Sequence, residues 1–211
     1  MIQNIYRNFE LDFGSISFSN IETSYDNSFS FIRLNIKVNN NNNNTKICIQ
    51  TPELINESGL LINNNGKFYL KLKTNSENLE FDEFITMMDQ YIIEYVFKNN
   101  IKNMGDTLLD YTKKYIYSIK NENNTKYMLS KLQKDADNIW AFEIYDSEKN
   151  LIKNNYFNKN EKLKAILICD GIWFTDNNFG LIWSIGQMQI LEKKIITGFS
   201  IVNDENKHIL F

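Results

Sequence analysis

The chain has 211 residues, of which 43% are hydrophobic and 14% aromatic, and its net charge is −3. This apolar content excludes a chain that is disordered throughout, and the length suits one domain with its own core. The negative charge argues against a protein that coats duplex DNA through an overall positive field. The charge is unevenly placed, however, because residues 111–134 hold six lysines and one acid and carry +5, while the remainder carries −8.

The two cysteines, Cys48 and Cys169, lie within apolar strand patterns and not in paired spacings. This placement predicts two buried thiols in a reducing compartment rather than a disulfide framework. No apolar run approaches the ~20 residues that span a bilayer, and no cationic start followed by an apolar run precedes the fold. We therefore expect an intracellular protein with no membrane partner and no secretion signal.

The first 28 residues alternate loosely and predict one or two short strands. Their expected core contacts are Phe13, Ile16, Phe18 and Ile21. Residues 29–38 predict a half-buried strand, because apolar and polar side chains alternate from Ile32 onward. The asparagine run at 39–44 ends that strand as a polar tip. Residues 46–51 predict the strand that pairs with it, and Pro52 ends this second strand because proline cannot donate to the ladder.

Residues 67–74 predict a strand with one apolar face and one basic face. The basic face carries Lys67, Tyr69, Lys71 and Lys73. Residues 81–99 predict a helix, because apolar side chains recur at steps of three and four over the whole segment. Asn78 or Ser76 is the expected N-terminal cap.

Residues 111–120 return to strand spacing, and further strands are predicted at 127–132, 140–145 and 195–202. Residues 163–191 predict the central hairpin, two apolar arms joined by a turn at 176–178. Gly171 and Gly186 lie inside the arms, where glycine marks a bulge or a bend at a barrel corner. Together the elements predict a mainly β fold, an antiparallel barrel with one long helix, in a single domain.

Enzyme classes find little support in the residues. The one histidine, His208, lies near the C-terminus, so no Ser-His-Asp or Cys-His arrangement is predicted. One histidine and two distant cysteines do not make a metal site, and the common phosphate-binding and zinc signatures are absent. Asp135 and Asp137 could act as an acid and base pair, but they read better as exposed turn residues. We expect no catalysis, no metal and no cofactor.

Tyrosines interleaved with lysines favour a binding function. Single-stranded nucleic acid needs cations that follow its phosphates and rings that stack on its bases. Trp173 and Trp183 fit either a stacking or a core role. The predicted nucleic-acid-binding residues are Lys67, Tyr69, Lys71, Lys73, Lys113, Lys114, Tyr115, Tyr117, Lys120, Lys126, Tyr127, Lys131, Trp173 and Trp183. The pattern serves DNA and RNA alike.

A series of short motifs carries a resemblance to a known family. The motifs are IQTP at 49–52, GL at 59–60, GKFYLKL at 66–72, FxxFIxxMDxxII at 81–93, YxxSIK at 115–120, YMLSKL at 127–132, FEIYD at 142–146, GIWF at 171–174 and FGLIWSIGQMQI at 179–190. In this order they resemble the single-stranded-DNA-binding proteins of nucleocytoplasmic large DNA viruses, a family similar to the podovirus type.

This resemblance implies an OB-like β-barrel with an inserted helix, spanning 1–211 with N- and C-terminal extensions. It implies a non-enzymatic role on single-stranded DNA in viral replication, recombination or repair, in the host-cell cytoplasm or a viral factory. Replication proteins and further copies of the chain are candidate partners. One departure weakens the case for replication partners: the podovirus type ends in an acidic tail, whereas 203–210 holds only Asp204 and Glu205 against Lys207 before Phe211. The alternative is a virion or scaffold protein that binds protein partners through the same barrel.

Overall fold

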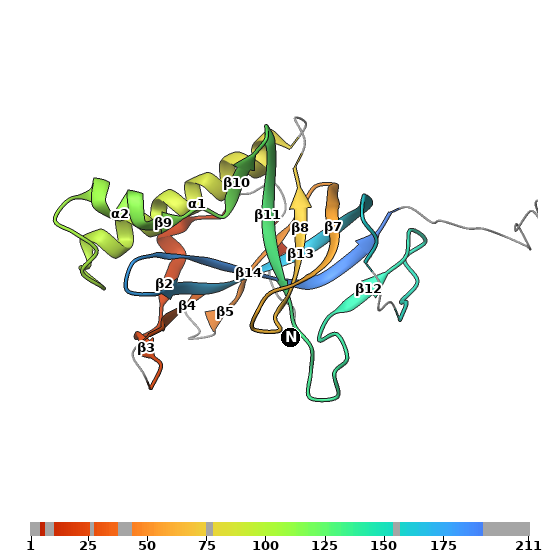
Figure 1. Ribbon diagram of the computed structural model, residues 1–211, viewed down its shortest axis with the longest axis horizontal. Helices are drawn as coiled ribbons and strands as arrows, with labels where there is room; N and C mark the ends of the chain where they lie inside the picture. Colours follow the sequence, from red (N-terminus) through yellow and green to blue (C-terminus); the bar gives the residue numbers. More distant parts are fainter. Residues whose placement is uncertain are drawn as a thin grey trace, which may run out of the picture.

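The structure is a computed structural model that describes residues 5–6, 11–25, 28–37, 44–74, 78–153 and 157–191. The strand predicted at 195–202, His208 and the C-terminal residues of the family comparison lie outside the described residues. Figure 1 shows the strands gathered around the long β13–β14 hairpin, with both helices on the same side of it.

Five strands form a closed barrel. They are β7 (Leu54–Ile62), β8 (Phe68–Lys73), β11 (Thr125–Leu132), β13 (Glu161–Phe174) and β14 (Phe179–Ile190). The strand order is β13-β7-β8-β11-β14, and the pairing of β13 with β14 closes the ring. The β11–β14 pair is parallel and the other four pairs are antiparallel. The long helix enters between β8 and β11, so the predicted OB-like barrel with an inserted helix is confirmed.

The central hairpin was predicted correctly, and Gly171 and Gly186 mark bulges as expected. Asp170 is the extra residue at one bulge, because Cys169 pairs with Trp183 and Gly171 with Ile182. Gly171 has a φ of 153°, and a Cβ there would lie 2.1 Å from the carbonyl oxygen of Ile32 on the neighbouring strand. Only glycine fits this position. Gly186 is the extra residue at the other bulge.

The long helix α1 (Leu79–Lys98) confirms the prediction for 81–99. Its apolar stripe packs into the core. The buried apolar residues of that stripe are Phe81, Phe84, Ile85, Met88, Ile92, Ile93 and Val96. Asn78 is the N-cap residue of α1, but its side-chain amide donates a hydrogen bond to the Glu53 carbonyl at 3.1 Å instead of capping the helix.

A second helix, α2 (Leu108–Lys114), corrects the strand predicted at 111–120. Thr107 and Asp110 form a capping box, in which each side chain accepts a hydrogen bond from the other's backbone N–H. This box starts a helix despite the strand-like spacing that follows. Tyr111 is buried on α2, where its ring meets those of Phe97 and Phe179 edge to face. Only β9 (Tyr115–Ile116) and β10 (Ile119–Glu122) keep strand geometry.

The N-terminal strands extend the sheet beside β13. They are β1 (Ile5–Tyr6), β2 (Ile16–Phe18), β3 (Glu22–Thr23), β4 (Ser30–Lys37), β5 (Asn44–Thr45) and β6 (Ile47–Gln50); the 3-10 helix η1 (Phe13–Ser15) precedes β2. The predicted partner of 46–51 was wrong. It is β5 that pairs with β4, while β6 pairs with β13 and β1. Phe13, Ile16 and Phe18 pack on the core as expected, but Ile21 is 44% exposed and does not.

Two further observations complete the fold. β12 (Glu143–Tyr145) pairs with β14 in parallel, which places the strand predicted at 140–145 at the end of the sheet. Cys48 and Cys169 are both buried thiols that form no disulfide, as predicted. Within the described part of the chain, no helix is long and apolar enough to cross a membrane.

Candidate nucleic-acid interface

A hollow of about 660 Å³ opens on the outer side of the barrel, and we call it the barrel hollow. It collects side chains from β7, β8, β9, β10, β11, β13 and β14, from the β7–β8 loop and from the residue before β4. Its lining residues are Phe29, Leu61, Ile62, Asn63, Lys67, Tyr69, Ile116, Tyr117, Ser118, Lys120, Leu129, Lys131, Trp173, Leu181, Ile182 and Trp183. Seven of the fourteen predicted site residues are therefore brought together in one place.

Strand register explains why these residues meet. On one wall, Tyr69 of β8 pairs with Leu61 of β7 and with Lys131 of β11. On the other wall, Trp173 of β13 pairs with Phe31 of β4 and with Gly180 of β14. Directly paired residues point to the same side of a sheet, so each row presents its side chains to one face.

Three of the aromatic residues predicted to stack, Tyr69, Tyr117 and Trp173, present partly exposed rings to the barrel hollow. Tyr117 is 40% exposed, and its ring rests edge to face on Tyr115 with centroids 5.3 Å apart. Tyr69 and Trp173 are half-buried. A Cβ on Gly180 would lie 3.2 Å from the Trp173 indole nitrogen, so the indole lies directly on the backbone of β14. Fixed rings with an open face are what base stacking requires.

Three lysines of the barrel hollow carry positive charge without a bound acid. No carboxylate among the described residues forms an ion pair with Lys67, Lys120 or Lys131. Lys67 lies in the loop between β7 and β8, Lys131 on β11 and Lys120 on β10. Ammonium groups placed beside stacking rings can hold the phosphates of a strand whose bases occupy the hollow.

The other predicted lysines lie elsewhere. Lys71 bridges Glu57 at 3.0 Å and Glu122 at 3.2 Å, and the hydrogen bond to Glu57 is the main reason that its pKa is raised. Lys126 bonds to the buried Asp82 of α1 at 3.0 Å. Lys73 on β8, and Lys113 and Lys114 in the last turn of α2, do not line the barrel hollow.

Burial argues against a stacking role for Tyr115 and Tyr127, and it favours the core role that was left open for Trp183. Tyr115 and Tyr127 are each 4% exposed, and Trp183 is 2% exposed. Tyr127 shares the outward face of Tyr69, but Lys71 lies 4.0 Å from its ring centroid and its hydroxyl donates to Glu122. Tyr115 and Trp183 pack in the core. None of these three rings offers a free face to a base.

A buried carboxylate holds the segment that carries Tyr117. Asp89 of α1 accepts hydrogen bonds from the Tyr115 hydroxyl at 2.6 Å, the Ser118 hydroxyl at 2.6 Å and the Ser118 backbone N–H at 2.9 Å. The Trp183 indole N–H donates to the Ser118 hydroxyl at 3.0 Å. Burial raises the pKa of Asp89 to about 6, against the opposing effect of these bonds. Tyr115, Ser118 and Trp183 therefore support the interface from below.

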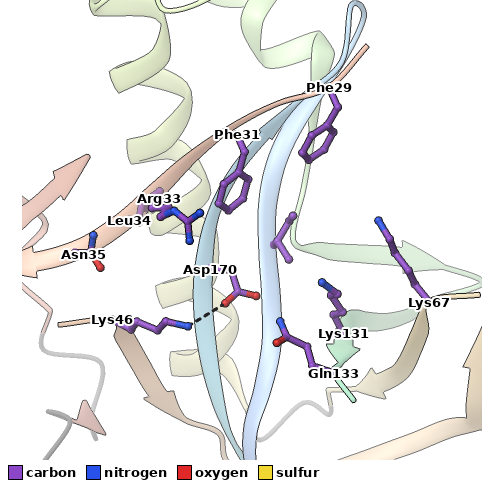
Figure 2. Close-up of a pocket in the computed structure, with 11 residues that line it drawn as sticks. Phe29, Phe31, Arg33, Leu34, Asn35, Lys46, Lys67, Lys131, Gln133 and Asp170 are labelled. Atoms are coloured by element: carbon purple, nitrogen blue, oxygen red, sulfur yellow. Dashed lines mark ion pairs between the residues drawn. The ribbon is translucent and has the colours of Figure 1, made fainter. Parts of the chain in front are cut away.

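A second hollow of about 410 Å³ adjoins the first, and we call it the β4 hollow. Phe29, Lys67, Lys131 and Ile182 line both hollows. Figure 2 shows Asp170 near its centre, with Lys46 on one side and Lys131 and Gln133 on the other. The remaining lining residues are Phe31, Arg33, Leu34 and Asn35.

Sequence reasoning missed the contribution of β4 to the interface. The face of β4 opposite its core residues carries Phe31, Arg33 and Asn35. The available signal was therefore an aromatic residue and an arginine on one outward face.

In the described ranges, no three His, Cys, Asp or Glu side chains gather as a metal site. Asp135 accepts from the backbone N–H groups of Asp137 and Ile139, as expected of a turn residue.

Comparison with known proteins gives similarity at the level of shape. No family model and no curated protein matches the chain. Among solved structures, the chain is similar to gp2.5, a single-stranded DNA-binding protein encoded by bacteriophage T7, with a TM-score of 0.48 and 12% identity over 74% of this chain and 98% of that one. It is also similar to the single-stranded DNA-binding protein from bacteriophage Enc34, with a TM-score of 0.45 and 6% identity over 75% of this chain and 88% of that one. Both TM-scores lie below 0.5, so neither likeness by itself carries a function to this chain.

Proposed function

We propose that this protein binds single-stranded DNA without catalysis, and that the barrel hollow is the binding site. The observation that carries the proposal is the meeting of three aromatic rings, Tyr69, Tyr117 and Trp173, with lysines that form no ion pair with a described carboxylate. Rings stack on bases whatever their identity, and ammonium groups follow the backbone.

The position of the hollow on the barrel supports the same ligand. OB-folds bind oligonucleotides on the face of their second and third strands and through the loops after the first and fourth strands. Those strands here are β8 and β11, and the loops are 63–67 and 175–178. Lys67 belongs to the first loop, and Trp173 lies just before the second.

The geometry favours a single strand over a duplex. The rings lie inside a hollow and not on a ridge, so a base must leave its own stack to reach them. A duplex keeps its bases paired and stacked, and its regular backbone would meet only the lysines at the rim. We extend the proposal to the setting that the motif resemblance implies, the covering of unpaired strands during replication, recombination or repair of viral DNA.

A protein partner is the second candidate, and one observation favours it. Apolar side chains are exposed around the barrel hollow: Ile62 is 61% exposed, and Ile116 and Leu129 are each 38% exposed. Such a rim also suits an apolar peptide segment on a virion or scaffold partner. A lysine-dependent affinity for oligonucleotides would decide between the two.

The proposal is tested by titrating the protein with labelled single-stranded oligo-dT and with a duplex of the same length, at several salt concentrations. We expect tight binding to the single strand, much weaker binding to the duplex, and affinity that falls steeply with salt. Equal affinity for both, or binding to neither, would overturn the proposal.

A further inference from the structure

The β4 hollow contains one feature that does not suit the binding of phosphate. Asp170 is the extra residue of the β13 bulge, and Figure 2 shows its carboxylate among cationic side chains. The side chain is 16% exposed, so it is mostly enclosed. A carboxylate in this position repels a phosphate and attracts hydrogen-bond donors.

The carboxylate of Asp170 keeps acceptor capacity available. Its ion-pair partner is Lys46, whose ammonium nitrogen lies 3.8 Å from Oδ1, a distance too long for a hydrogen bond. Within the described part of the chain, no side-chain or backbone donor forms a hydrogen bond with it. Arg33 lies near enough to interact electrostatically with Asp170, but the Arg33 guanidinium donates hydrogen bonds to the Glu22 carboxylate at 3.1 and 3.2 Å.

An aromatic surface lies directly beside this carboxylate. A Cβ on Gly171 would lie 2.6 Å from the ring of Phe31, so the ring covers the backbone of the residue next to Asp170. The ring of Phe29 lies nearly parallel to that of Phe31, with centroids 6.5 Å apart and 12° between the planes. Phe29 is 40% exposed and belongs to both hollows. A base stacked here would point an edge toward Asp170.

Among the four bases, guanine is the best match to a carboxylate at that edge. Its Watson–Crick edge carries two adjacent donors, N1–H and the N2 amino group, which suit the two oxygens of one carboxylate. Cytosine, adenine and thymine each place an acceptor beside their donor, and that acceptor faces the second carboxylate oxygen. The β4 hollow is also large enough, because small-molecule sites occupy about 300–1,000 Å³.

The geometry points to a guanine-selective subsite in the β4 hollow, with the base on Phe31 and its N1–H and N2 amino group donating to Asp170. Lys46, released from Asp170 by the base, is then available to the adjoining phosphate. This inference rests on the proposed function, because it deepens the same interface. The subsite makes the affinity depend on sequence: any single strand binds, and a strand with guanine in this position binds more tightly.

The test compares a short oligo-dT with the same oligonucleotide carrying one central guanine, which cannot form a quadruplex alone. We expect the wild-type protein to bind the guanine oligonucleotide about tenfold more tightly, the discrimination typical of one good bidentate contact. Replacing the guanine by hypoxanthine, which lacks the N2 amino group, removes most of that gain without any change to the protein. Asp170→Asn is expected to abolish the preference, so that its affinities for the two oligonucleotides differ by less than about twofold.

Glu53→Gln is the matched control, because it removes one carboxylate that pairs with Lys162 at 3.2 Å and lines neither hollow. It should keep the full preference for guanine. Equal affinity for the two oligonucleotides in the wild type, or a preference that survives Asp170→Asn, overturns the subsite while oligo-dT binding leaves the proposed function standing. Binding to neither oligonucleotide overturns both.

Discussion

The salt dependence of oligo-dT affinity distinguishes most sharply between lysines that line the barrel hollow and lysines that do not. The perturbation is the double variant Lys67→Gln with Lys131→Gln, which removes two ammonium groups that no described acid neutralises. The control is Lys113→Gln with Lys114→Gln, which changes the net charge equally on α2, outside both hollows. Any difference between the variants therefore reflects position and not total charge.

The expected magnitude follows from counterion release. For single strands, the slope of log affinity against log salt is about −0.7 for each phosphate neutralised. Removing Lys67 and Lys131 should therefore make the slope shallower by about 1.4, whereas the control double variant should leave it nearly unchanged. The assay is fluorescence anisotropy of labelled oligo-dT over a salt series. If both double variants shifted the slope equally, the lysines would act only through net charge. The proposal that Lys67 and Lys131 contact DNA phosphates would then be refuted.

Three further predictions concern single side chains. Tyr69→Ala and Tyr117→Ala should each weaken oligo-dT binding by about 1–3 kcal/mol, measured by anisotropy, whereas Tyr145→Ala, outside both hollows, should not; equal losses in all three would contradict the assignment. Tyr127→Phe should lower the free energy of unfolding in urea by about 1 kcal/mol, because it removes the hydrogen bond to Glu122, with oligo-dT affinity unchanged; a loss of binding would mean that the Tyr127 hydroxyl takes part in the interface. Burial raises the folded-state pKa of Asp89 from 3.8 to about 6. The free energy of unfolding should therefore be greatest below pH 4 and fall by about 3 kcal/mol as pH rises through 6, relative to Asp89→Asn. Parallel pH profiles of urea unfolding in the two proteins would show that the carboxylate does not titrate there.

The parts of the fold that alternation and helical spacing specify were predictable. The β13–β14 hairpin and α1 depend on local apolar patterns, and Gly171 and Gly186 directly mark the bulges of the hairpin. The helix α2 was missed because the capping box of Thr107 and Asp110 decides its start, while the residues after it read as a strand. Strand partners such as β5 for β4 depend on contacts that no local pattern contains.

The site was predictable only in part, for a related reason. Alternation tells which residues share a face, but it does not tell whether another element covers that face. Tyr127 shares the face of Tyr69 and is covered by Lys71 and Glu122. Phe31 and Trp173 meet through ladder register although they are far apart in the sequence. The basic and aromatic composition therefore indicated the kind of ligand, and the tertiary fold decided which residues face it.

Intrinsic tryptophan fluorescence on adding oligo-dT tests the central claim, that unpaired bases stack in the barrel hollow. Trp173 is half-buried and lines the hollow. Trp183 also lines it but is only 2% exposed, and Trp140 is 9% exposed within an aromatic cluster that does not line it. We expect oligo-dT to quench the wild-type fluorescence, and Trp173→Phe to lose most of that quenching while it keeps most of its affinity. Tight binding with no quenching in the wild type, or quenching that persists undiminished in Trp173→Phe, would contradict this account.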